Sequence, residues 1–241
     1  MAQSKDNPVD SRYASVLGPF TTAEQAIETE KDEVSTECDA FNQFKGRIAN
    51  TEISPPAQPP QQLVSGTRFA ETRFRGIERV RSIFRDTVMS VDHYETVYGE
   101  SLDEHVEAEL SREVAAGLHE ETTVSLTEYF KSALITSVDD AIYRRQIILE
   151  NLDEEARSLD RIRAELVDLF DVCDRSLVPL RIQNDIREEL DEIARQRQET
   201  IHRRNPSSRT DGHDLCTYLY HEEEWTYPAL TAVARFRNGI N

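Results

Sequence analysis

Residues 148–173 read ILENLDEEARSLDRIRAELVDLFDVC, and this stretch decides the fold. Two sets of apolar residues recur in it at heptad spacing: Leu152, Leu159, Leu166 and Cys173, and Ile148, Ile162 and Leu169. Such a repeat places both sets on one face of a helix and is typical of a coiled coil. Glu155 is the single polar interruption, and we expect it to set the register or to pair with an arginine across the bundle. Because residues 125–178 contain neither Gly nor Pro, one long helix can run through them.

Pro179 ends this uninterrupted segment, since proline lacks an N–H group and clashes with the preceding helical turn. Apolar residues at helical spacing resume afterwards: Ile182, Ile186, Leu190, Ile193 and Ile201. We therefore expect two helices that form an antiparallel hairpin. The sequence leaves open whether the helix is continuous through Pro179.

An earlier helix is predicted over residues 21–50. Thr21 and Glu24 have capping-box spacing, and the apolar residues Ile27, Val34, Phe41 and Ile48 recur every seven positions. Residues 1–20 are predicted to be a disordered tail. Residues 51–67 contain four prolines between positions 55 and 60 and predict an extended linker.

The remainder, residues 68–241, is predicted to be a helical bundle domain. Apolar spacing predicts a helix over 69–88, and the capping box of Ser101 and Glu104 predicts another over 101–119. The segment 213–241 is rich in aromatic residues and predicts a short helical cap, with Pro228 in the first turn of its last helix. The predicted fold class is therefore all-α: a long-helix bundle with an antiparallel coiled-coil hairpin, an N-terminal coiled-coil helix and a C-terminal cap.

Composition indicates habitat more than activity. The 241 residues carry 46 acidic and 28 basic side chains, a formal net charge of −18, and the basic residues are 24 Arg and 4 Lys. Such acidity with little lysine is expected in a cytoplasm at molar salt, where the Debye length falls to about 3 Å. A G+C-rich genome would explain the arginine bias but not the acidity. Only 8 glycines are present, which argues against a glycine-rich phosphate-binding enzyme.

The predicted location is the cytoplasm, without a membrane span. The first 20 residues do not resemble a signal peptide, and no apolar run is long enough to cross a bilayer. The three cysteines, Cys38, Cys173 and Cys216, are widely spaced and imply no disulfide framework.

Three short runs resemble an uncharacterised helical family of haloarchaeal proteins. They are Phe84-Arg-Asp-Thr-Val-Met89, Glu150-Asn-Leu-Asp-Glu-Glu155, and Cys216-Thr-Tyr-Leu-Tyr220 followed by Trp225-Thr-Tyr-Pro-Ala-Leu230. The resemblance covers roughly residues 68–241. It implies a salt-adapted cytoplasmic protein of unknown function and assigns no catalytic residues.

Candidate metal ligands are few. His213, Cys216 and His221 lie within nine residues, but their spacing is not that of a common zinc finger, and whether they bind a metal is left open. Glu199 and His202 have the spacing found in di-iron bundles, yet no second Glu-x-x-His accompanies them. We predict no catalytic residue, no cofactor and no metal.

Charge is segregated along the chain, because residues 68–85 are arginine-rich whereas residues 100–128 are strongly acidic. Two interpretations compete: these helices pair within the bundle, or the arginines bind phosphates of a nucleic acid. We favour the first. The nucleic-acid residues in the second would be Arg73, Arg75, Arg79, Arg81 and Arg85.

The predicted function is a non-enzymatic protein–protein interaction or scaffold role. The apolar stripe of residues 21–50 needs a cover that an isolated helix cannot supply, so we expect self-association or a protein partner there. The alternative is a nucleic-acid-binding transcriptional regulator that uses the arginine-rich helix.

Overall fold

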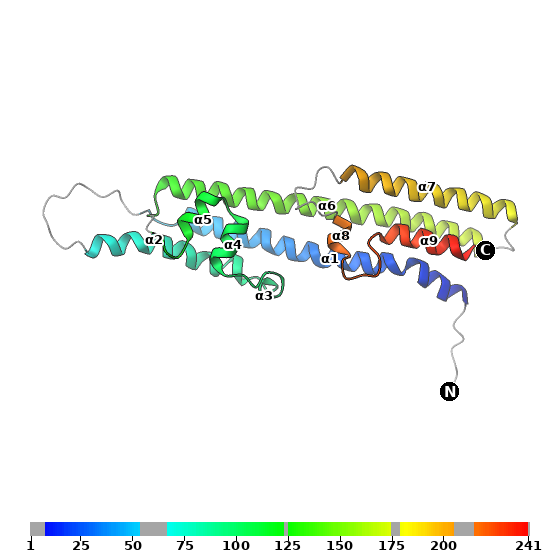
Figure 1. Cartoon of the computed structure of the whole chain (residues 1–241), viewed down its shortest axis with the longest axis horizontal. Coiled ribbons are helices and arrows are strands. Elements are labelled where there is room, and N and C mark those ends of the chain that lie inside the picture. The colour runs from blue at the N-terminus through cyan, green and yellow to red at the C-terminus, as the bar shows by residue number, and fades with distance from the viewer. Residues whose placement is uncertain (1–7, 54–66, 123–124, 175–178, 205–214, 241) are drawn as a thin grey trace, which may run out of the picture. The chain divides into compact units, whose positions relative to one another are not determined.

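The computed structural model describes residues 8–53, 67–122, 125–174, 179–204 and 215–240 (Figure 1). Within these ranges every regular element is helical, which confirms the all-α prediction. No helix in the described part of the chain is long and apolar enough to cross a membrane.

The helices follow one another as α1 (Pro8–Ala49), α2 (Thr67–Arg85), the 3₁₀ turn η1 (Val88–Ser90), α3 (Tyr94–Val97), α4 (Leu102–Glu109), α5 (Arg112–Leu118), α6 (Glu128–Asp174), α7 (Leu180–Arg204), α8 (Leu215–Leu219) and α9 (Pro228–Gly239). They form two compact units. The middle unit is Asp32–Glu150, and the terminal unit combines Met1–Lys31 with Asn151–Asn241. The long helices α1 and α6 each contribute residues to both units.

The middle unit is built on an apolar core that five helices share. Phe41, Phe44 and Ile48 of α1 pack against Phe84 of α2, with Phe44 and Phe84 in an edge-to-face contact whose ring centroids are 5.1 Å apart. Apolar residues of α4, α5 and α6 complete this core: Leu102, Val106, Val114, Leu118, Phe130, Leu134 and Val138. The predicted helix 101–119 is divided into α4 and α5, because the chain becomes extended at Leu110 and Ser111 starts a new helix as its N-cap.

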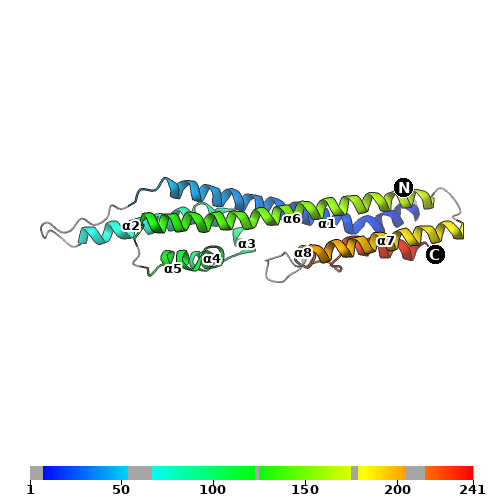
Figure 2. The ribbon, with the colours of Figure 1, turned by 90° about the horizontal axis from the view of Figure 1, so that it is seen from above.

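The terminal unit contains the predicted hairpin. In Figures 1 and 2, α7 runs back along the C-terminal part of α6, and the heptad residues Leu152, Leu159, Leu166 and Ile162 are buried. α6 ends at Asp174 and α7 begins directly after Pro179, so the two are separate helices. α9 contacts α7, and its first turn contains Pro228 as predicted.

The C-terminal cap closes the terminal unit. Phe236 of α9 stacks on Phe170 of α6 with ring centroids 4.0 Å apart, and Tyr220 and Val233 are buried. Trp225 is half-buried and lies 5.5 Å from the Tyr220 ring. The prediction of an aromatic cap is confirmed for these described residues.

The predicted start of the first helix was wrong. α1 begins at Pro8 rather than at Thr21, so residues 8–20 of the predicted tail are helical, while residues 1–7 lie outside the described residues. The reason is that Val16, Leu17 and Phe20 continue the apolar stripe toward the N-terminus and are buried. Burial of this face outweighs the helix-breaking tendency of Gly18 and Pro19.

The helix accommodates Pro19 through a side chain from the other end of the chain. Proline has no N–H to donate, so the carbonyl of Ser15, four residues earlier, loses its usual helical partner. Arg235 of α9 donates from Nη1 to this Ser15 oxygen at 2.9 Å. The side chain thereby replaces the missing backbone hydrogen bond.

The C-terminus of α1 has a similar side-chain donor. Lys131 of α6 donates from Nζ to the carbonyl of Ala49 at 2.7 Å and to that of Thr51 at 2.9 Å. The last carbonyls of a helix have no intrahelical donor, and a cation there is favoured by the helix dipole. Residues 54–66 of the predicted linker lie outside the described residues.

Candidate functional site

Charged side chains in the core are the most unusual chemistry of this molecule. Glu37, Arg145, Glu155 and Arg197 are each less than a tenth exposed. All four occupy core-facing positions of the helical repeats: Glu37 falls between Val34 and Phe41, and Arg145 lies seven residues before Leu152. They form two ion clusters, one in each unit.

The middle cluster is centred on Arg145 of α6. Its Nε donates to Oε2 of Glu37 in α1 at 2.7 Å, and its Nη1 donates to Oε2 of Glu109 in α4 at 2.8 Å. The guanidinium carbon also lies 4.4 Å from the centre of the Phe41 ring, within the range of a cation–π contact. One arginine thus links three helices.

Glu37 accepts further hydrogen bonds on its other oxygen. The Tyr98 hydroxyl donates to Oε1 at 2.8 Å, and His93 Nε2 lies 3.1 Å from the same atom. His93 and Tyr98 flank α3 at its two ends. The carboxylate of Glu37 therefore fastens α3 to the helices that carry the cluster.

The cluster shifts the pKa values of its members. Burial would lower the pKa of Arg145, but the hydrogen bond and charge of Glu109 outweigh it and raise the pKa. Burial would raise the pKa of Glu109, but the hydrogen bond and charge of Arg145, with the charges of nearby basic side chains, together outweigh burial and hold the pKa below its ordinary value of 4.5. Burial and the charge of Glu37 together raise the pKa of Tyr98, so its phenol remains a neutral donor.

The ion pair of the terminal cluster is less exposed than that of the middle cluster. Glu155 of α6 is 0% exposed and Arg197 of α7 is 1% exposed, and the arginine donates from Nη2 to Oε1 of the glutamate at 2.5 Å. This confirms the prediction that Glu155 pairs with an arginine across the bundle. The Arg197 Nη1 group donates to the Ser158 hydroxyl at 3.0 Å.

The short helix α8 and the turn after it add two side chains to the terminal cluster. Cys216 Sγ lies 3.7 Å from Arg197 Nη2, and the Tyr220 hydroxyl donates to Oε1 of Glu155 at 3.4 Å. Arg197 Nε has no hydrogen-bond partner among the residues that the structure describes. Burial and the charge of Glu155 raise the pKa of Tyr220. Burial would lower the pKa of Arg197, yet the charge of Glu155 raises it.

In both clusters the glutamate side chains accept hydrogen bonds from a guanidinium. These charge-assisted hydrogen bonds join the helices that carry the paired side chains.

The residues discussed above as metal ligands fall in different environments. His213 lies outside the described residues, Cys216 belongs to the terminal cluster, and His221 is exposed with Nδ1 2.9 Å from the carbonyl of Tyr218. Glu199 pairs with Arg195 on its own helix. The part of the chain that the structure describes contains no group of three His, Cys, Asp or Glu side chains that could hold a metal.

The arginine-rich helix α2 is partly committed to contacts within the bundle. Arg81 is buried, donates to Asp103 Oδ1 at 2.8 Å and also bonds the Leu118 carbonyl. This confirms the favoured interpretation, pairing with the acidic segment, for that residue. Arg79 and Arg85 are exposed, and the side chains of Arg73 and Arg75 lie outside the described residues.

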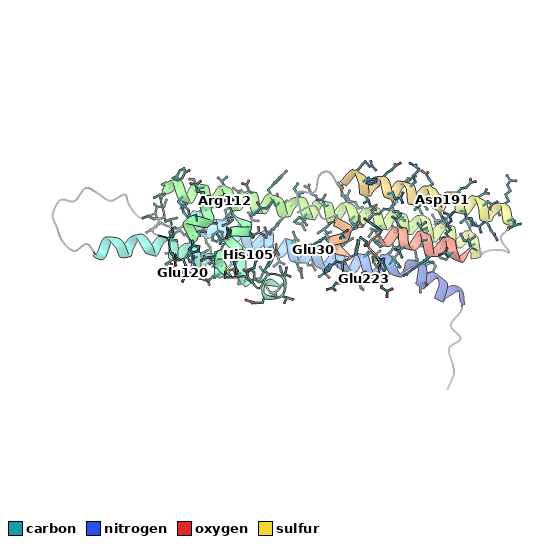
Figure 3. The ribbon with its side chains drawn as sticks, viewed as in Figure 1. Glu30, His105, Arg112, Glu120, Asp191 and Glu223 are labelled. Carbon is teal, nitrogen blue, oxygen red and sulfur yellow. The ribbon has the colours of Figure 1, made fainter. Side chains whose placement is uncertain are left out.

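A buried histidine in the middle unit escaped prediction. His105, labelled in Figure 3, is 2% exposed, and its Nδ1 lies 3.0 Å from Oε2 of Glu100. The rings of Phe84, Tyr94 and Tyr98 surround it, with centroids between 4.9 and 5.9 Å away. The only available signal was its position one residue before the apolar Val106 on a helix with a single buried face.

The chain belongs to a family described as a domain of unknown function (DUF7260), whose model matches residues 18–241. The family match therefore includes α1 from residue 18 onward, whereas the resemblance noted in the sequence began only near residue 68. Searches of curated proteins and of solved structures find no match to this chain.

Proposed function

We propose that this chain is a non-enzymatic protein–protein interaction protein that works in the cytoplasm of a halophilic, haloarchaeal cell. The observation that carries the proposal is an apolar pair exposed on the middle-unit part of α6. Tyr143 is 62% exposed and Ile147 is 36% exposed, on successive turns of one face. The other isoleucines of α6 are buried or half-buried, so Ile147 departs from the pattern of its own helix.

The surface that the sequence suggested for association is not free in this structure. Ile27, Val34, Phe41 and Ile48 are at most 5% exposed, because other helices of the same chain cover the stripe. A coiled-coil partner at residues 21–50 would have to displace those helices. We therefore move the proposed contact to Tyr143 and Ile147.

A photo-crosslinking amino acid at position 143 or 147, introduced into the full chain in its native cells, tests the proposal. We expect the same protein to be captured at both positions and not at Asp160, an exposed control position on α6. Capture no stronger than at position 160 would contradict the proposed contact.

The salt-adapted habitat rests on the −18 net charge and the scarcity of lysine. We expect the unfolding free energy to rise with KCl concentration up to the molar range, since salt screens repulsion between the many carboxylates. A free energy of unfolding that is unchanged between about 0.1 M and 1 M salt would contradict it.

The alternative role, a nucleic-acid-binding regulator, retains support only from the exposed Arg79 and Arg85. Arg81 is already committed to Asp103 and is not available to a phosphate. Double-stranded DNA binding that is lost in Arg79→Glu/Arg85→Glu, and kept in Arg112→Glu, would favour this alternative.

A further inference from the structure

We propose that an exposed strip on α6 binds an amphipathic helix of a partner protein whose apolar centre lies between basic residues. The strip consists of Asp140, Tyr143, Ile147 and Glu150, and all four side chains are exposed. This inference rests on the proposed interaction function and adds the chemistry of the partner.

The spacing of the strip suits a helical partner. Its residues are three, four and three positions apart, which is the spacing of a coiled-coil seam and places them along one face. At about 1.5 Å per residue the strip is about 15 Å long, roughly three helical turns. A partner helix of similar length can lay apolar side chains against Tyr143 and Ile147.

The two ends of the strip define the charge of the partner. Neighbouring carboxylates of α6 are neutralised within the chain: Asp139 pairs with Lys45 at 2.5 Å, and Asp153 pairs with Lys31 at 2.5 Å. Asp140 and Glu150 are exposed and form no ion pair with any residue that the structure describes. An apolar pair between two such carboxylates complements a helix with an arginine or lysine on each side of its apolar centre.

The same charges disfavour the other occupants of this surface. A second copy packed antiparallel would place Asp140 opposite Glu150, and a parallel copy would place each carboxylate opposite its equivalent. Like charges across an interface suppress such pairings. Nucleic acids and anionic lipid surfaces are repelled for the same reason.

The test uses a fluorescent helical peptide as the probe, with the full chain as the receptor. The peptide carries two leucines four positions apart and an arginine outside each of them, and binding is followed by anisotropy at low and at molar salt. We expect Tyr143→Glu/Ile147→Glu to weaken binding by more than about 10-fold at both salt concentrations, because the apolar contact is lost. Asp140→Asn/Glu150→Gln should weaken it about 3–10-fold at low salt and less at high salt.

The matched control is Asp160→Asn/Asp168→Asn, which removes two exposed carboxylates from α6 outside the strip. Binding to this variant should stay within 2-fold of the unmodified protein, within the range of an exposed charge. Circular dichroism and the denaturation midpoint establish that each variant is folded.

Four results would overturn the inference. One is equal binding by the Tyr143→Glu/Ile147→Glu variant, and another is equal weakening by the control, since both indicate non-specific attraction to an acidic protein. The third is undetectable binding of the probe, and the fourth is equal binding of a peptide with glutamates in place of the arginines. Photo-crosslinking at positions 143 and 147 would still decide the proposed function separately, because it assumes nothing about the partner's charge.

Discussion

The two ion clusters both contain charged side chains in the core, but they differ in how far those charges are buried. In the middle cluster, Arg145 faces two carboxylates whose side chains are 10% and 17% exposed, and Tyr98 and His93 supply further contacts to Glu37. In the terminal cluster, the side chains of Arg197 and Glu155 are 1% and 0% exposed, and Ser158, Cys216 and Tyr220 supply further contacts. The carboxylates of the middle cluster are partly open to water, whereas the ion pair of the terminal cluster is completely buried.

This difference predicts how each unit responds when one charge is removed. A buried ion that loses its partner lowers the free energy of unfolding strongly, because water cannot reach the ion to solvate it. The loss is smaller where other donors or nearby water still stabilise the ion. The Glu155 side chain is 0% exposed, so water cannot replace the guanidinium of Arg197, whereas the side chains of Glu37 and Glu109 are 10% and 17% exposed. Of the four experiments below, given from the largest effect to the smallest, the first three test that contrast and the fourth compares two further side-chain contacts, one in each unit.

The largest effect should come from Arg197→Met, which leaves the carboxylate of Glu155 buried without its guanidinium. We expect the unfolding free energy to fall by about 3–5 kcal/mol, measured by chemical denaturation at constant salt. Replacing both partners, Glu155→Leu with Arg197→Met, should restore most of that loss, because no charge then remains buried.

The control for this substitution is Arg195→Met on the same helix. Arg195 pairs with Glu192 and Glu199 at the surface, where water screens the charges, so its loss should cost much less than that of Arg197. If Arg197→Met costs no more than this control, the terminal cluster contributes nothing beyond a surface ion pair.

A smaller loss is expected for Arg145→Met. Tyr98 continues to donate to Glu37, and Arg144 still donates to the Glu109 side chain at 3.3 Å, so we expect a loss on the order of 2–3 kcal/mol. The same denaturation measurement checks it. A loss larger than that of Arg197→Met would reverse the contrast between the clusters.

Acid should weaken the middle cluster through Glu109. Its pKa in the folded protein lies below the ordinary value of 4.5, so the unfolded chain binds this proton more readily than the folded one. Its contribution to stability is complete above pH 4.5 and is lost as the pH falls through the folded pKa. In Glu109→Gln the unfolding free energy should fall less steeply with acid over that window.

Glu107→Gln is the matched control for the acid experiment, since Glu107 is exposed on the same helix. It should leave the acid slope close to that of the unmodified protein. An unchanged slope in Glu109→Gln would mean that the ion pair with Arg145 does not contribute to the pH dependence of folding.

The smallest effects concern the two cations that donate to backbone carbonyls of α1, one in each unit. Lys131 donates hydrogen bonds to two carbonyls in the middle unit, and Arg235 donates one to a carbonyl in the terminal unit. Lys131→Met should therefore cost about 1–1.5 kcal/mol and Arg235→Met about 0.5–1 kcal/mol. Amide exchange should accelerate near Ala49 in the first variant and near Pro19 in the second. Exchange that is unchanged at both sites would show that water replaces these donors without loss.

Much of the fold could be predicted because the spacing of apolar residues can be read directly from the sequence. Leu152, Leu159 and Leu166 fixed the buried face of α6, and the interruption at Glu155 pointed to an arginine partner before any contact was known. The start of α1 could not be read in this way. Gly18 and Pro19 favour a break locally, and only the burial of Phe20 by other helices overrides them.

The partners within the middle cluster could not be predicted from the sequence. Glu37 and Arg145 both occupy core positions of their repeats, and these positions indicated that the two side chains are buried. A pattern that considers apolar residues alone does not include them. Which helix would supply each counter-charge is a property of three-dimensional packing. Residue spacing along one helix carries no information about its neighbours, and Glu109 and Tyr98 were therefore not assigned.

The contact between Arg235 and Ser15 has a consequence for how the protein is made. The middle unit is one continuous segment of chain, whereas the terminal unit combines Met1–Lys31, which precede that segment, with Asn151–Asn241, which follow it. During translation the Ser15 carbonyl, deprived of a donor by Pro19, must be hydrated until Arg235, 220 residues later, has left the ribosome. The middle unit can fold before α9 is synthesised, and the terminal unit closes only after α9 has emerged.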